Sequence, residues 1–375
     1  MRGIVSSPLA PNPLSGARPA FALRLTRRYR FAMAADSPHS TQPRARVLSG
    51  IQPTGELHVG NWLGAVRTWV SQVVEQKEEL LFCVVDAHAI TIEYDPVKLH
   101  ERTMTMARDL IACGLDPDRC TLFVQSDVRE HTELAWYLAN VTPFGDLSRM
   151  TQFKDKVEKD EHVLAGFFMY PVLMSADILL YKATVVPVGD DQLQHLELAR
   201  ETARRFNHRF GETFPEPKAR MSVAPRIMGL DGQGKMSKSK GNTIALFEGR
   251  ESFWTKLRGA YTDPQRLRRT DPGRPEICNI YTMHKALSTP EQVDLTYKEC
   301  TTAARGCIDC KKILMENFDR ELVPLRARRA ELDANPGRTQ EALGDGAAKA
   351  RRIAERTMAE VRERLGLGSG ATTTR

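Results

Sequence analysis

The sequence predicts an α/β protein in which a doubly wound parallel sheet is followed by a helical region. Between residues 47 and 242, short runs rich in valine, leucine and phenylalanine alternate with amphipathic segments of helical length. Such alternation is typical of a parallel sheet covered by helices on both faces. Past residue 243 the strand-like runs fade while helical patterns continue. This change separates an α/β domain from a helical one.

Local patterns define the expected elements. Strands are expected at residues 47–48, 80–86, 121–125 and 184–188, with helices at 61–74, 96–113, 130–140, 165–181 and 192–206. Further helices are expected at 251–261, 290–300, 308–334 and 340–365. The chain therefore divides into an α/β domain over residues 47–242 and a helical domain over 243–366. A small polar tail over residues 367–375 is expected to be disordered.

The first 46 residues have a composition of their own. They hold eight arginines, one acid (Asp36) and no lysine, and between Arg18 and Ala35 the arginines interleave with apolar residues. An arginine-rich, acid-poor start is typical of an organellar transit peptide. We expect residues 1–46 to be a disordered transit peptide for the mitochondrial matrix, with the chloroplast stroma or dual targeting as alternatives. A basic arm that stays on the protein and contacts RNA is the competing interpretation.

The net charge of +7 comes from this leader alone. Of the chain's 54 basic and 47 acidic residues, the leader holds eight and one, so the remainder carries 46 of each. A balanced remainder excludes a body that coats nucleic acid through its overall charge, so RNA contacts must come from local patches. No apolar run approaches the length that spans a bilayer, which predicts no membrane partner.

A glycine-rich turn after the first predicted strand is the first candidate site. Gly50, Gly55 and Gly60 lack a Cβ, so a phosphate group can approach the backbone closely there. The helix that follows presents free N–H groups and a positive dipole end to an anion. His58 and Asn61 add side-chain donors at the same place. The turn is therefore a candidate nucleotide-binding site.

A basic loop over residues 226–242 is the second candidate site. Lys235 and Lys238 flank Ser237 between glycines at 229, 232, 234 and 241. Lysines in such a loop can follow the charge of a departing pyrophosphate, and a flexible loop can close when that group is present. A solvated basic loop without a ligand is the competing interpretation.

Several segments together resemble one family. Residues 57–61 (LHVGN) and 235–239 (KMSKS) resemble, in order and separation, the two nucleotide-binding loops of class I aminoacyl-tRNA synthetases. Residues 85–91, 150–154, 170–181, 186–195 and 203–207 are similar to segments of the bacterial-type tryptophanyl-tRNA synthetases. The resemblance covers roughly residues 47–366. It implies a Rossmann-like catalytic domain over 47–242 and a helical anticodon-binding domain over 243–366.

The resemblance implies a tryptophan–tRNA ligase. Such an enzyme activates L-tryptophan with ATP and transfers it to tRNA(Trp), here for organellar translation, and it is expected to be a homodimer. Mg²⁺ is expected with the ATP, whose phosphates supply its ligands. One alternative is a tyrosyl-specific member of the same subclass. Another is a catalytically silent RNA- or protein-binding relative, which would tend to lose residues such as His58, Lys238 and Asp177.

The resemblance also implies which residues meet ATP. The expected nucleotide-binding residues are Gln52, Pro53, Thr54, Gly60, Asn61, Gly189, Asp190, Asp191, Ile227, Met228, Lys235, Met236, Ser237, Lys238 and Ser239. Gly189 and Asp191 are expected at the ribose, and the backbone of Ile227 and Met228 at the adenine edge. Catalysis by positioning and charge stabilisation is expected from His58, Asn61, Lys154, Lys235 and Lys238.

Asp177 is the residue expected to select tryptophan. It lies in an otherwise apolar helical run, where a buried acid is costly unless a donor binds it, and the indole N–H is only a donor. An acid that faces water or an arginine is the competing interpretation. The other residues expected around tryptophan are Leu48, His88, Tyr170, Met174, Val186, Val188 and Gln192. Leu48 stands where many relatives have phenylalanine.

Four cysteines in the helical region form a candidate metal site. Cys278, Cys300, Cys307 and Cys310 are spaced C-x21-C-x6-C-x2-C. Clustered thiolates in a reducing compartment suggest a metal rather than disulfides. Four thiolates suit a [4Fe–4S] cluster or zinc, and some bacterial relatives carry such a cluster with nearly this spacing. Four cysteines without a ligand are the alternative, and Cys83, Cys113 and Cys120 are expected to be packed thiols.

Overall fold

The computed structural model describes residues 44–159, 162–221, 227–234, 236–237 and 240–368. Residues 44–375 form one compact unit. The predicted transit peptide lies outside the described residues except for its last three positions, and Arg46 already begins the first strand. The predicted tail lies outside them from residue 369 onward.

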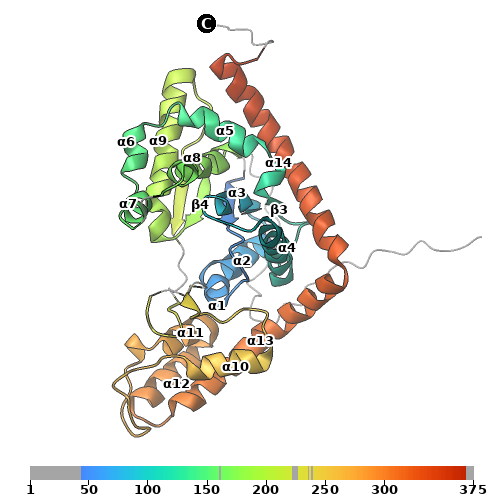
Figure 1. The fold of residues 1–375 in the computed structure, drawn as a ribbon. Helices are drawn as coiled ribbons and strands as arrows, with labels where there is room; N and C mark the ends of the chain where they lie inside the picture. The colour runs from blue at the N-terminus through green and yellow to red at the C-terminus, as the bar shows by residue number, and fades with distance from the viewer. Residues whose placement is uncertain (1–43, 160–161, 222–226, 235, 238–239, 369–375) are drawn as a thin grey trace, which may run out of the picture. The chain divides into compact units, whose positions relative to one another are not determined.

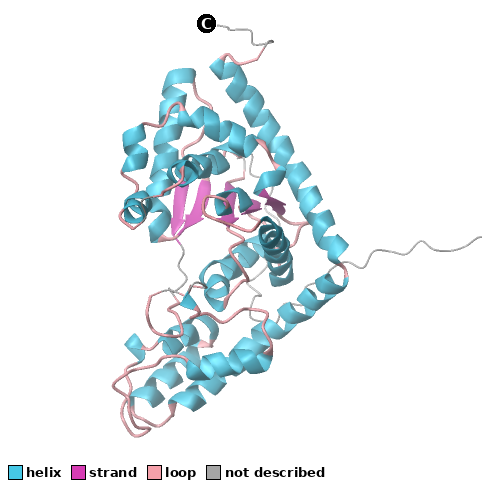
Figure 2. Ribbon diagram, viewed as in Figure 1, coloured by secondary structure: helices cyan, strands magenta, loops and turns pink. Residues whose placement is uncertain are grey.

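A parallel five-stranded sheet forms the centre of the α/β part, as the sequence predicts (Figures 1 and 2). Its order is β3-β2-β1-β4-β5, and the described pairs are all parallel. The strands are β1 (Arg46–Ile51), β2 (Glu79–Val84), β3 (Thr121–Val124), β4 (Val185–Val188) and β5 (Lys218–Met221). Strand β5 was not predicted, because this edge strand is mostly exposed and carries no apolar run.

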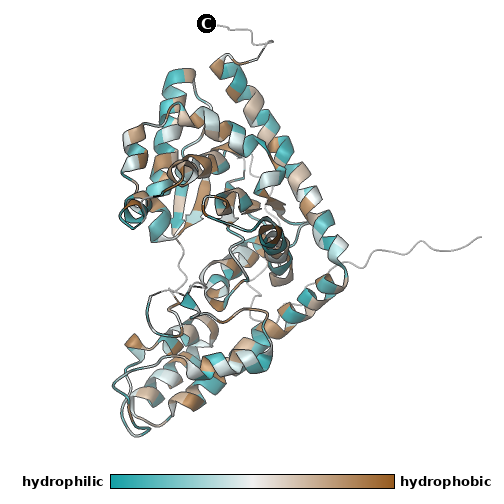
Figure 3. Ribbon diagram, viewed as in Figure 1, coloured by the Kyte–Doolittle hydropathy of each residue, from teal (hydrophilic) through white to brown (hydrophobic). Residues whose placement is uncertain are grey.

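Side chains of the strands alternate between two apolar layers, which makes the sheet doubly wound. Val47, Leu80 and Phe82 pack into one layer with helices on that face, whereas Leu48 and Leu81 pack into the other. This alternation follows from the two-residue period of a strand. In Figure 3 helix α8 is almost wholly brown, as expected of a helix that is buried against the sheet.

The helices of the α/β part surround this sheet. They are α1 (Val59–Asn61), a π-helical turn (Trp62–Val66), α2 (Arg67–Glu75), α3 (Asp86–Ala89), α4 (Pro96–Cys113), α5 (Glu130–Ala139), α6 (Phe144–Ser148), α7 (Thr151–Val157), α8 (Ala165–Leu180) and α9 (Leu193–Phe210). Helix α4 has the predicted bounds, because Asp95 caps its first turn and Gly114 ends it with a φ of 113°. The short helices α3, α6 and α7 were not predicted.

The remaining helices are α10 (Arg250–Gly259), α11 (Asn279–Leu287), α12 (Pro290–Thr301), α13 (Cys307–Ala334) and α14 (Pro336–Leu365). The region is helical as predicted, and α11 is an addition. The strand pairing found among the described residues after 243 is an isolated antiparallel bridge between Ala245 and His58.

Helix α14 returns to the sheet and helps to cover it. It contacts β3, α4, α5 and α8, and Figure 1 shows it running beside α5. A Cβ at Gly346 would collide with the carbonyl of Leu122, so this glycine lets the helix lie against β3. Arg362 also donates to Glu133 at 2.8 and 2.6 Å. The domain boundary at residue 242 stays a prediction, but α14 shares a core with the α/β part.

Within the described part of the chain, no helix is both long and apolar enough to cross a bilayer.

Candidate active site

The first glycine-rich turn ends in a reciprocal cap between His58 and Asn61. His58 Nδ1 accepts from the Asn61 backbone N–H at 3.2 Å, and Asn61 Oδ1 accepts from the His58 N–H at 3.2 Å. Because Nδ1 is an acceptor, a neutral His58 ring carries its proton on Nε2. Pro53 is buried, whereas Gln52 and Thr54 are exposed. The cap therefore fixes the ring of His58 at the start of α1.

The structure brings the first turn against the second loop. Leu57 O accepts from the Leu246 N–H at 2.7 Å, and the Val59 N–H donates to Ile244 O at 3.0 Å. A Cβ added at Gly60 would lie 3.3 Å from the Cβ of Met236. Two segments more than 170 residues apart in the sequence thus lie side by side. Lys235, Lys238 and Ser239 lie outside the described residues.

Asn242 organises the described part of the second loop. Its Oδ1 accepts from the Ser237 N–H at 2.8 Å, and its Nδ2 donates to the Asp231 carboxylate at 3.0 and 3.1 Å. The backbone closes the loop where the Leu230 N–H donates to Asn242 O at 2.9 Å. A Cβ at Gly229 would collide with Asn242 Nδ2, which requires glycine there. Asn242 was not predicted as a site residue, although it directly follows Gly241 of the loop.

Helix α11 supports the backbone at Ile227 and Met228. Ile227 is buried, and its carbonyl lies 3.5 Å from the Met236 N–H. The Asn279 side chain accepts from the Met228 N–H at 3.1 Å and donates to Met228 O at 2.8 Å. Asn279 was not predicted as a site residue, because nothing in the local sequence indicates a partner 51 residues away.

Asp177 is buried and binds three protein donors. Its Oδ1 accepts from Gln125 Nε2 at 2.6 Å and from His131 Nδ1 at 2.7 Å. Its Oδ2 accepts from His88 Nε2 at 2.8 Å. The other ring nitrogen of His131 lies 2.8 Å from the Tyr181 hydroxyl. The interpretation of Asp177 as an acid facing water is therefore wrong.

These donors keep the Asp177 carboxylate ionised. Burial alone would raise its pKa, but the hydrogen bond from His131 and the charge and hydrogen bond of His88 outweigh burial and hold the pKa well below the usual range. A carboxylate offers about four lone-pair sites, so three donors leave roughly one for a further donor. Gln125, His131 and Tyr181 were not predicted as site residues. The position of Gln125 just after β3, at the ligand-binding edge of the sheet, was a usable signal.

The other predicted tryptophan-site residues lie on the same face of the sheet. Leu48, Val186 and Val188 are buried in one apolar cluster, and Met174 packs partly buried against it. The ring of His88 meets that of Tyr170 edge-on, with centroids 6.4 Å apart.

A hydrogen-bond chain orients Tyr170. Its hydroxyl donates to Gln152 Oε1 at 2.9 Å and lies 2.7 Å from His195 Nε2. Because that hydroxyl has one proton, His195 Nε2–H must be the donor in the second bond. Burial lowers the pKa of His195 to about 4 and raises the pKa of Tyr170 to about 12, so both groups are neutral at pH 7.

The predicted ribose and phosphate residues lie at the surface. Gly189, Asp190 and Asp191 follow β4 and are exposed, and a Cβ at Gly189 would lie 2.9 Å from Asp191 Oδ1. Gln192 donates to Asp191 at 3.2 Å. Lys154 is exposed on α7, and it has no hydrogen bond or ion pair with the described residues of either loop. Lys154 is therefore not joined to the described residues of the two loops.

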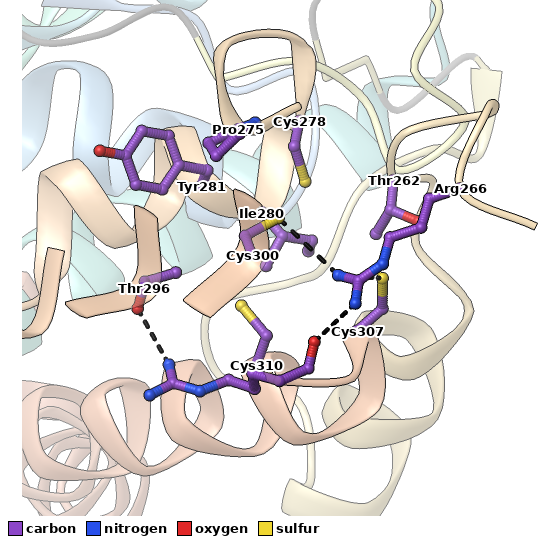
Figure 4. Close-up of a pocket in the computed structure, with 11 residues that line it drawn as sticks. Thr262, Arg266, Pro275, Cys278, Ile280, Tyr281, Thr296, Cys300, Cys307 and Cys310 are labelled. Atoms are coloured by element: carbon purple, nitrogen blue, oxygen red, sulfur yellow. Dashed lines mark hydrogen bonds between the residues drawn. The ribbon is translucent and has the colours of Figure 1, made fainter. Parts of the chain in front are cut away.

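The four helical-region cysteines line one cavity of about 30 Å³ (Figure 4). Cys278 precedes α11, Cys300 lies on α12, and Cys307 and Cys310 begin α13. Arg266 Nη1 lies 3.8 Å from the sulfur atoms of both Cys300 and Cys307. Burial raises the pKa of the Cys310 thiol to about 12. No three histidine, cysteine or carboxylate groups of the described residues are arranged to hold a metal ion.

A parallel sheet whose first strand leads into a turn that contacts a second, basic loop, with a buried acid on an apolar helix, is the arrangement of the catalytic domain of a class I aminoacyl-tRNA synthetase. The family described as tRNA synthetases class I (W and Y) matches residues 40–323. A tryptophan–tRNA ligase of Deinococcus radiodurans is 53% identical over 325 residues, which are 86% of this chain and 98% of that protein. The chain belongs to the tryptophanyl-tRNA synthetases of this class.

Other relatives agree with this assignment. A tryptophan–tRNA ligase of Thermotoga maritima is 43% identical over 86% of this chain and 99% of its own length. The crystal structure of the Campylobacter jejuni tryptophanyl-tRNA synthetase complexed with ADP and tryptophan matches with a TM-score of 0.77 and 36% identity. That match covers 86% of this chain and all of the other.

Proposed function

We propose that this chain activates L-tryptophan with ATP, which forms tryptophanyl-adenylate and pyrophosphate, and then transfers tryptophan to the 3′ end of tRNA(Trp). The observation that carries the proposal is the buried, ionised Asp177, which keeps roughly one acceptor site beside an apolar cluster. That arrangement suits a large aromatic ring with one N–H donor. The named relatives support the same substrate.

Activation is an attack of the tryptophan carboxylate on the α-phosphorus of ATP, with pyrophosphate as the leaving group. The protein contributes mainly position and charge, and no side chain needs to exchange a proton with the reacting atoms. His58 and the start of α1 bind phosphates, while Asp191 accepts from the ribose hydroxyls. Lys235 and Lys238 neutralise the departing pyrophosphate, and Mg²⁺ enters with ATP and is held largely by its phosphates.

Specificity comes from the remaining acceptor site of the Asp177 carboxylate, which the indole N–H of tryptophan fills when it binds. A ring without an N–H leaves the buried carboxylate with an unmet acceptor site and is rejected strongly. Leu48, Val186 and Val188 then pack against the ring. A tyrosyl-specific enzyme also presents an acid to a polar ring atom, so the test must compare the two amino acids directly.

Amino-acid-dependent ATP–pyrophosphate exchange on the full chain tests the proposal. We expect exchange with tryptophan and at least about 100-fold less with tyrosine, because a few kcal/mol separates a paired from an unpaired buried acceptor. Charging of tRNA(Trp) by the same preparation tests the second step. Exchange with tyrosine alone favours the tyrosyl alternative, and exchange with neither indicates a silent relative.

We propose that the four cysteines hold a [4Fe–4S] cluster that stabilises the helical region. A shared cavity and the adjacent positive charge of Arg266 suit an anionic cluster. A zinc ion bound by the four thiolates is the alternative. Anaerobic purification should yield a brown protein with about four iron atoms per chain. Stoichiometric zinc supports the alternative, and a colourless metal-free protein overturns the proposal.

We propose that the chain forms a homodimer and that the helical region binds the anticodon end of tRNA(Trp). Trp136 on α5, Phe144 on α6 and Leu164 before α8 are exposed by 68, 75 and 59%, which is unusual for side chains of this size. Light scattering of the full chain should give twice the mass of 42.1 kDa, and a monomer at micromolar concentration would refute the dimer.

We propose that residues 1–46 direct the protein to an organelle, in the first place the mitochondrial matrix. The support is compositional, because residues 1–46 hold eight arginines and one acid. Most of this segment also precedes the family match, which begins at residue 40. A fluorescent protein fused behind residues 1–46 should enter mitochondria. Entry into plastids supports the chloroplast alternative, and a cytosolic signal contradicts the proposal.

A further inference from the structure

Asn279 occupies a junction between two features that lie far apart in the sequence. It opens α11, it is only 5% exposed, and its side chain makes three hydrogen bonds to the backbone near the second loop. Oδ1 accepts from the Met228 N–H at 3.1 Å. Nδ2 donates to Met228 O at 2.8 Å and to Gly229 O at 3.3 Å. The amide thus pairs with Met228 as a neighbouring strand would, through both a donor and an acceptor.

Met228 and Gly229 form the base of the second loop. Gly229 N–H donates to Gly234 O at 2.9 Å, and the Leu230 N–H donates to Asn242 O at 2.9 Å. A further bond, from the Tyr261 N–H to Leu230 O at 2.7 Å, ties the next residue to the chain beyond α10. The position of the Asn279 amide therefore sets where the loop begins.

The residue before Asn279 is Cys278, which lines the four-cysteine cavity (Figure 4). Cys278 is also the cap residue of α11, and its carbonyl accepts from the Thr282 N–H at 3.1 Å. One peptide bond therefore separates the wall of the cavity from the amide that holds Met228. A displacement of Cys278 must move Asn279, because a buried and fully bonded amide has little freedom to adjust.

We propose that Asn279 is a positioning residue for ATP, and that the Cys278–Asn279 step couples the cysteine cavity to the nucleotide site. This inference rests on the proposed function, in which the backbone of Met228 lies along the adenine edge. Asn279 touches neither ATP nor tryptophan in this account. It holds the backbone of Met228, which lies along the adenine edge, and it fixes the base of the loop that carries Lys235 and Lys238.

The test of the positioning role compares Asn279→Ala with a matched control, Asn317→Ala. Asn317 is 3% exposed on α13, and its Nδ2 donates to Ser288 Oγ and Gln292 Oε1 at 2.8 and 3.2 Å, away from the loop. Both variants lose a buried amide. We expect Asn279→Ala to raise the KM for ATP about 10-fold or more, with the KM for tryptophan changed less than about twofold.

Asn317→Ala should lower thermal stability and leave the KM for ATP unchanged. Asn279→Asp keeps an acceptor for the Met228 N–H but places a carboxylate oxygen against the carbonyls of Met228 and Gly229, so it should raise the KM for ATP at least as much as Asn279→Ala does. Equal effects of the two alanine variants on both substrates would overturn the positioning role. A wild-type chain without tryptophan-dependent exchange would instead refute the proposed function, so the two failures can be told apart.

A double-mutant cycle on ATP affinity tests the coupling. Equilibrium dialysis of ATP against the full chain gives a dissociation constant for wild type, Cys278→Ser, Asn279→Ala and the double variant. If Cys278 acts through Asn279, Cys278→Ser should weaken ATP binding at least about threefold in wild type and have little further effect in Asn279→Ala. Additive effects, or no effect of Cys278→Ser in wild type, would overturn the coupling.

Discussion

Asp177 concentrates the specificity of the site in one carboxylate. An isolated buried carboxylate would raise its pKa and become neutral, but Gln125, His131 and His88 supply three donors at 2.6–2.8 Å. His131 is itself oriented by the Tyr181 hydroxyl at 2.8 Å. This network fixes both the charge and the direction of the carboxylate before the substrate arrives. The site is therefore preorganised to accept a hydrogen bond from an N–H donor.

The substitution Asp177→Asn should remove this recognition while it preserves shape. An amide nitrogen replaces one acceptor oxygen, so either the indole N–H or one of the protein donors loses its partner. We expect the KM for tryptophan to rise on the order of 100-fold, since hydrogen bonds to charged groups contribute about 1.5–3 kcal/mol. Exchange measured with tryptophan and with its benzothiophene analogue, which lacks the N–H, checks this. An unchanged preference for tryptophan would contradict the role of Asp177.

At the scale of elements, two buried asparagines hold the described ends of the second loop. Asn279 fixes its base at Met228, and Asn242 closes its far end at Ser237 and Leu230. The first helix is anchored separately, because Trp62 in the π-helical turn donates to Glu321 of α13 at 3.2 Å. The turn that holds His58 is therefore tied to helix α13 as well as to the backbone at Ile244 and Leu246.

Within this loop, Lys238→Ala should lower the rate of adenylate formation by roughly 100-fold or more and leave tryptophan affinity nearly intact. The lysine acts on charge that develops in the transition state, which ground-state binding does not sense. Lys240→Ala is the matched control, since Lys240 is an exposed lysine two residues farther along the loop. Single-turnover kinetics measures the rate. A parallel loss of tryptophan binding, or equal effects of the two lysines, would count against the assignment.

The elements differ in how far the sequence predicts them. Helix α4 was predicted with its observed bounds, because Asp95, Pro96 and Gly114 are local signals for its two ends. Strand β5 and helix α11 were not predicted. Strand β5 carries no apolar pattern and owes its strand conformation to pairing with β4. The same distinction applies to the site. Asp177 was predicted from the family resemblance together with its apolar helix, whereas His131 and Asn279 gain their roles from partners 46 and 51 residues away.

At the scale of the whole molecule, the C-terminal helices bind the two parts of residues 44–375 into one unit. Helix α13 packs against α4 on one face of the sheet, while α14 covers β3 and α5 on the other. Helical periodicity indicates an apolar face but not which surface will cover it, so the sequence did not predict that α14 packs on β3. The stability of the catalytic site and that of the helical region are therefore linked.

Buried histidines should make this stability depend on pH. The pKa of His195 is lowered by burial from 6.5 to about 4, so unfolding takes up a proton between these values. The contribution is nearly complete above pH 7 and is lost as the pH falls toward 4, by about 2.5 kcal/mol at pH 4.5. Denaturant unfolding of His195→Gln should therefore show a shallower loss between pH 7 and 4.5 than wild type. Other groups, such as Asp109 with a pKa raised by burial to about 6, affect both proteins alike. Parallel pH profiles for the two proteins would contradict this.

The most direct measurement for the account as a whole is the distance from the indole nitrogen to Asp177 in a crystal structure with tryptophan and a non-hydrolysable ATP analogue. We predict a hydrogen bond of about 2.8–3.0 Å from the indole N–H to an Asp177 carboxylate oxygen. The adenine should lie along the backbone of Met228 in the same crystal. An indole bound elsewhere, with Asp177 still engaged only by His88, Gln125 and His131, would contradict the central claim.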